Sequence, residues 1–71
     1  MKIEFSKDAD AIYISFHEEE VDRSEEIQDG VVVDFNAQGR LIGIEVLDVS
    51  KRFETSDISS IHIENILREA V

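Results

Sequence analysis

The chain has 71 residues, no cysteine, and 17 acidic against 7 basic side chains, which give a formal net charge of −10 at pH 7. This length predicts one domain over residues 1–71. The missing cysteines exclude disulfides and thiolate metal sites, so we expect no cofactor. A field of this sign repels phosphate backbones, so we expect no autonomous nucleic-acid binding. No apolar run is long enough to cross a bilayer and no signal-peptide pattern opens the chain, so we expect a cytoplasmic protein without membrane contact.

The N-terminal third predicts a hairpin followed by an edge strand. Residues 2–5 and 11–16 alternate apolar and polar side chains, as half-buried strands do, and the polar segment 6–10 between them has turn chemistry. The acidic run at residues 17–20 is expected to face water. Residues 21–27 are polar for a strand, which favours the edge of a sheet, where charges deter aggregation.

The middle of the chain contains the strongest local signal, a second hairpin. Two β-branched runs, residues 31–35 and 41–47, flank a turn at residues 36–39. Gly39 is the expected residue of positive φ in that turn. Gly43 lies inside the second run, where glycine costs stability unless a bulge or a side chain packed across the strand needs the space.

After this hairpin the pattern becomes helical. Asp48 is the expected N-cap of a short helical turn that ends at residue 53. Residues 57–70 are expected to form a C-terminal helix, because four apolar residues share one helical face, with an N-cap at Asp57, Ser59 or Ser60. The alternation at residues 60–63 leaves open an extended entry into it.

The predicted fold class is α+β. About five antiparallel strands, a meander of hairpins over residues 2–47, precede the helical turn and the C-terminal helix. One face of this sheet carries far more apolar side chains than a helix about 18 Å long can cover. Because monomers rarely expose large apolar patches, we expect a homo-oligomer, with a dimer favoured.

Three segments of the chain, residues 5–14, 25–34 and 39–48, resemble the DUF2283 family of short prokaryotic proteins. The run from Gly39 to Asp48 resembles the family's most distinctive pattern, Gly-x-x-x-Gly-Ile-Glu-Ile-Leu, whereas Ser6 stands where the family usually has aspartate. The resemblance covers roughly residues 2–50. It implies a small antiparallel sheet with helical additions and no established activity, and some relatives look like members of toxin–antitoxin gene pairs.

The residue of most interest is Glu45, a carboxylate in an otherwise apolar strand. One interpretation makes it a base, a ligand or a partner contact beside the space at Gly43. The other, which we favour, makes it a solvent-facing residue or the partner of Arg40 or Arg23 in a cross-strand ion pair. The candidate interaction or family-motif residues are Asp10, Tyr13, Gly39, Gly43 and Glu45.

A carboxylate cluster is the alternative that would give the chain a metal site. Glu45 would bind a divalent cation through oxygen ligands, together with Asp10, Asp34, Glu25 and Glu26. Their spacing matches no known cation loop, and no nucleophile or phosphate-binding motif is present. We therefore expect neither metal ligands nor catalytic residues.

Three hypotheses for function remain, in order of preference. The first is a homodimeric protein-interaction module without catalytic activity. The second is an antitoxin-like neutraliser whose acidic surface or C-terminal helix covers a small basic toxin. The third is a carboxylate-based metal-binding protein or small enzyme centred on Glu45.

Overall fold

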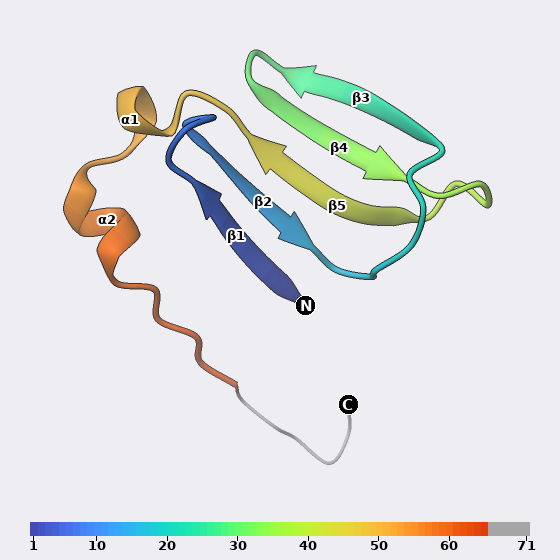
Figure 1. Cartoon of the computed structure of the whole chain (residues 1–71). Coiled ribbons are helices and arrows are strands. Elements are labelled where there is room, and N and C mark those ends of the chain that lie inside the picture. Colours follow the sequence, from blue (N-terminus) through green and yellow to red (C-terminus); the bar gives the residue numbers. More distant parts are fainter. Residues whose placement is uncertain (66–71) are drawn as a thin grey trace.

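The computed structural model describes residues 1–65, which form a five-stranded antiparallel sheet followed by two short helices (Figure 1). The elements are β1 (Lys2–Ser6), β2 (Ala11–Ser15), β3 (Arg23–Gln28), β4 (Val31–Phe35), β5 (Leu41–Val46), α1 (Val49–Arg52) and α2 (Thr55–Ser59). The predicted α+β class is confirmed. Within residues 1–65, no helix is long and apolar enough to cross a membrane.

The strand order is β1-β2-β5-β4-β3, so the sheet is not the plain meander that we predicted. Both predicted hairpins are present, and β3 is an edge strand, as expected. However, β2 pairs with β5 instead of β3. The connection from β2 passes the ends of β5 and β4, where the Phe16 amide donates to the Ile42 carbonyl and the Asp22 amide to the Phe35 carbonyl. This order places the apolar β5 in the centre and the charged β3 at the edge, where solvent reaches it.

The strand register gives the sheet two chemically different faces. On one face, which we call the apolar face, two rows of side chains cross β1, β2, β5 and β4. These rows are Phe5–Ile12–Val46–Val31 and Ile3–Ile14–Ile44–Val33. On the opposite, polar face the rows are Glu4–Tyr13–Glu45–Val32–Glu26 and Ser15–Gly43–Asp34–Ser24.

Helix α1 is held to the sheet by a side chain from the β1–β2 turn. The Val49 side chain is completely buried, and its amide donates to the Asp10 carbonyl at 3.0 Å. The Asp10 carboxylate accepts hydrogen bonds from the Ser50 amide at 2.9 Å and the Ser50 hydroxyl at 2.6 Å. Asp10 therefore caps a helix that lies forty positions further along the chain.

The prediction that Asp48 supplies this cap through its carboxylate is wrong. Asp48 occupies the N-cap position, but its backbone is left-handed, with φ 54° and ψ 45°, and its side chain makes no capping bond. A capping side chain ordinarily projects from an extended residue. With Asp48 left-handed, the free amide is satisfied by Asp10 instead.

Arg52 fixes the other end of α1 to the β3–β4 turn. Its Nε donates to the Leu47 carbonyl at 2.7 Å and its Nη2 to the Asp29 carbonyl at 2.5 Å. The guanidinium lies against Gly30, where a Cβ would overlap it. Helix α1 thus joins two turns at the same end of the sheet.

The chain after α1, residues 54–65, which we call the arm, is less helical than predicted. Helix α2 ends at Ser59, and residues 60–65 have no regular structure, so the predicted helix 57–70 is wrong over that part and lies outside the described residues from 66 onward. The prediction of an N-cap at Asp57, Ser59 or Ser60 is wrong, because α2 has Glu54 as its N-cap. The Glu54 amide donates to the Asp57 carboxylate at 2.9 Å. Serine and isoleucine are weak helix formers, and a helix this short gains little cooperativity.

The Asp10 cap is tested by a pair of matched alanine variants. Asp10 and Asp48 have nearly equal positive φ, 53° and 54°, so alanine pays the same left-handed penalty at both positions. Because only Asp10 caps α1, we expect Asp10→Ala to lower the free energy of unfolding by about 1 kcal/mol more than Asp48→Ala. Urea denaturation measures both. Equal losses would show that the cap contributes nothing.

Candidate functional site

The most organised group of polar side chains lies on the polar face and spans four strands. Tyr13 on β2 donates its hydroxyl hydrogen to Asp34 Oδ2 on β4 at 3.0 Å. Ser24 on β3 donates to Asp34 Oδ1 at 2.5 Å. We call this group the Tyr13–Asp34–Ser24 row. It crosses β5 at Gly43, the cross-strand partner of Asp34.

Gly43 makes room for the tyrosine in this row. A Cβ at position 43 would overlap the Tyr13 hydroxyl oxygen and would lie 3.2 Å from the Ile14 carbonyl oxygen. Of the two reasons for a glycine at this position, a side chain packed across the strand is present, namely Tyr13. A shift of register between Asp34 and Phe35, as a bulge or irregularity produces, lies beside it.

Asp34 is buried, with 9% of its surface exposed. Moving a carboxylate out of water costs several kcal/mol unless donors replace the lost hydration. Tyr13 and Ser24 provide two such donors, one to each carboxylate oxygen. The row therefore satisfies the buried charge, and its geometry is that of a structural network.

The electrostatics of Tyr13 support a donor role. Burial raises the pKa of Tyr13 above its ordinary value of 10.0, and the hydrogen bond to Asp34 and the charges of Asp34, Glu45 and Glu4 raise this pKa further. Each of these effects disfavours the tyrosinate. The phenol therefore keeps its proton at neutral pH and is a poor general base.

Glu45 is half-buried on the polar face, opposite Tyr13 in the register. Within residues 1–65, no ion pair joins it to Arg23 or Arg40, so of the two favoured options the cross-strand pair is absent and a partly solvent-exposed side chain remains. Arg23 pairs instead with Glu25 and stacks on the Phe35 ring, 4.1 Å from its centroid.

The candidate carboxylate cluster does not assemble. Asp10 lies in the turn that caps α1, and Glu25 belongs to the opposite face from Glu45, because it pairs with Val33. Asp34 already accepts two hydrogen bonds. In the part of the chain that the structure describes, no group of three or more histidine, aspartate or glutamate residues could hold a metal ion.

The last predicted residue, Gly39, has a conformational role. Its φ is +80°, as expected for this turn, and a Cβ there would meet no atom within 4 Å. Sequence reasoning missed Ser24, Ser50 and Arg52, which complete the polar row and fix α1. Apart from the Leu47 carbonyl, five positions from Arg52, their partners lie 10 to 40 positions away, so no local pattern marks them.

The fold and the polar row define a small antiparallel-sheet protein in which the best-ordered polar site is structural. The model of the DUF2283 family, described as a protein of unknown function, matches residues 2–50. The chain therefore belongs to the DUF2283 family. The matched region contains all five strands and both partners of the Asp10–Ser50 contact, whereas the arm lies outside it. No curated protein and no solved structure matches the chain.

The space at Gly43 is tested by a double-mutant cycle with Tyr13. We expect Gly43→Ala to lower the free energy of unfolding by about 1–3 kcal/mol, because the new methyl group displaces the tyrosine. In a Tyr13→Ala background the overlap is gone, so the same change should cost far less. An equal cost in both backgrounds, measured by urea denaturation, would show that Tyr13 does not impose the glycine.

The raised pKa of Tyr13 predicts a loss of stability in alkali. The protonated phenol stabilises the fold fully below pH 10.0, the unfolded value, and this contribution disappears as the pH rises through the higher pKa of the folded state. Tyr13 is the only tyrosine and the chain has no tryptophan, so tyrosinate absorbance reports its titration directly. Tyr13→Phe should lack this component of the alkaline loss. A midpoint at or below 10.0 would contradict the proposed environment.

Proposed function

We propose that the chain is a homodimeric protein-interaction module without catalytic activity, acting in the cytoplasm. The observation that carries the proposal is the amount of exposed surface. The chain exposes 5901 Å², whereas a compact monomer of its mass exposes about 4,500 Å². The extended chain after α1 (Figure 1) contributes to this excess of about 1,400 Å², which is larger than the roughly 800 Å² that each partner buries in a standard interface.

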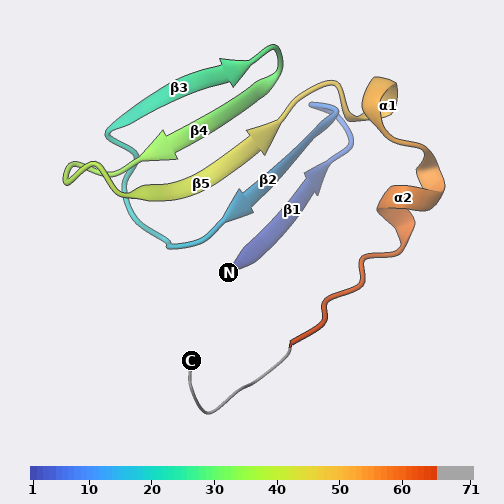
Figure 2. The same cartoon turned by 180° about the vertical axis from the view of Figure 1, so that it is seen from behind.

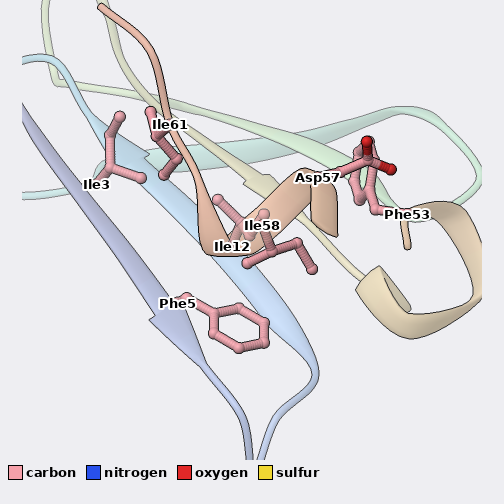
Figure 3. Close-up of a pocket in the computed structure, with 7 residues that line it drawn as sticks. All are labelled: Ile3, Phe5, Ile12, Phe53, Asp57, Ile58 and Ile61. Atoms are coloured by element: carbon pink, nitrogen blue, oxygen red, sulfur yellow. The ribbon is translucent and has the colours of Figure 1, made fainter. Parts of the chain in front are cut away.

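Apolar side chains account for much of this exposure. Ile3 and Phe5 on β1 are 40% and 47% exposed, and Phe53 and Ile61 are 41% and 59% exposed. Side chains from the sheet and from the chain after α1 surround an open cavity of about 510 Å³ (Figure 3). An exposed apolar surface of this kind is characteristic of a protein that binds another protein surface.

The antitoxin-like alternative rests on a different observation, the charge of −10. Glu18, Glu19 and Glu20 are exposed in the loop after β2, and Glu4 and Glu26 are exposed on the polar face. A small basic protein would be attracted to these groups, and its association would weaken with salt. A catalytic or metal-binding role for Glu45 has no comparable support, because its neighbours among residues 1–65 do not form a ligand set.

The first measurement is the native mass of tagged protein purified from its own cells, by light scattering with mass spectrometry of co-eluting proteins. We expect about twice the chain mass of 8.1 kDa. A single chain at micromolar concentration would contradict the homodimer. A stoichiometric basic companion that is released by salt would favour the neutraliser instead.

A further inference from the structure

We propose that a second copy of this chain docks on the apolar face of the sheet, sheet against sheet, so that both polar faces are turned outward. The inference rests on the proposed homodimer and identifies its interface. Three features support it: the distribution of charge between the two faces, the position of the arm, and the area left exposed.

Charge excludes the polar face as the contact between copies. Each copy carries −10, and Glu4, Glu45, Asp34 and Glu26 place carboxylates of four strands on the polar face. Two such faces in contact would bring like charges together, which opposes association. The apolar face of β1, β2, β5 and β4 contains only isoleucine, valine and phenylalanine in its two rows. It is therefore the sheet face on which two acidic copies can meet without this repulsion.

The arm leaves most of the apolar face uncovered. The cavities beside it are lined on the sheet side by residues of β1, β2 and the turn between them. Figure 2 likewise shows the arm on the β1 side of the sheet, away from β4 and β3. The hydrogen bonds of the arm, among the residues described, are local to it. On β5 and β4 this face keeps Val31, Ile44 and Val46 half-buried and Val33 buried, so it is only partly open to another cover.

The geometry of two sheets suits this face. Sheets pack about 10 Å apart with their inner side chains interdigitated. A two-fold axis through such a contact places the apolar rows of one copy against the same rows of the other. Both copies of the surface are then used, so the assembly closes as a dimer. The excess of about 1,400 Å² per chain is larger than the roughly 800 Å² per partner of a standard interface, so a contact of that size on this face is compatible with it.

The test compares substitutions on neighbouring positions of β1 that lie on opposite faces. Ile3→Lys with Phe5→Lys puts charge on the apolar face, whereas Glu4→Lys puts the same side chain on the polar face. All three positions are exposed on an edge strand. We expect the double variant to weaken dimerisation at least about 100-fold and to elute as a single chain. Glu4→Lys should remain a dimer. Circular dichroism checks the fold of each variant.

A crosslinking experiment keeps the inference testable if the double variant does not fold. Because the chain has no cysteine, Ile44→Cys and Glu45→Cys each place a single thiol on β5, on the apolar and the polar face respectively. A bismaleimide that spans about 10 Å, the distance between packed sheets, should join two chains of Ile44→Cys and not of Glu45→Cys.

The outcomes separate the interface from the dimer itself. A wild-type chain that is monomeric overturns both proposals. A wild-type dimer that survives Ile3→Lys with Phe5→Lys, or that crosslinks through Glu45→Cys instead of Ile44→Cys, overturns the interface and leaves the homodimer in place. Co-elution with a different protein that the apolar-face variant no longer binds also overturns the assignment of a second copy to this face.

Discussion

The pairing of β2 with β5 is the interaction on which the rest of the structure depends. It joins the N-terminal hairpin to the three strands that follow, and it aligns Ile14 with Ile44 and Tyr13 with Glu45. Only with this register can Tyr13 cross Gly43 and reach Asp34. The same pairing holds the β1–β2 turn at the end of the sheet where Asp10 caps α1.

The local features of the fold were predictable from the sequence, and the long-range ones were not. The two hairpins, the edge position of β3 and the positive φ of Gly39 depend on neighbouring residues and were predicted correctly. The strand order depends on a pairing across thirty positions, from Ile14 to Ile44. For the site, the sequence indicated that Gly43 needs space, but identifying Tyr13 as the occupant requires the register of three strands. Helical periodicity overestimated the C-terminal helix because it ignores the weak propensities of serine and isoleucine.

On this sheet the buried polar groups have their hydrogen-bond partners, whereas some of the apolar side chains are left exposed to water. On the polar face the buried carboxylate of Asp34 has its donors, and the tyrosine that crosses Gly43 has its partner. On the apolar face, Ile3 and Phe5 remain exposed beside an open cavity. The Tyr13–Asp34–Ser24 row, whose polar groups already have partners, is therefore little available to a ligand. The surface with exposed side chains is the apolar face, whose two rows carry no charge.

The hydrogen bonds between Asp10 and Ser50 that hold α1 bear on the order in which the elements fold. The hairpins close short loops. The contact between Asp10 and Ser50 closes a loop of forty positions, which has a higher entropic cost. We expect that contact to become favourable only after β2 has paired with β5, so that α1 forms late in folding. During synthesis the N-terminal hairpin has no neighbour for β2 until β5 has left the ribosome. The high contact order of this central pairing, more than any local propensity, should set the folding rate.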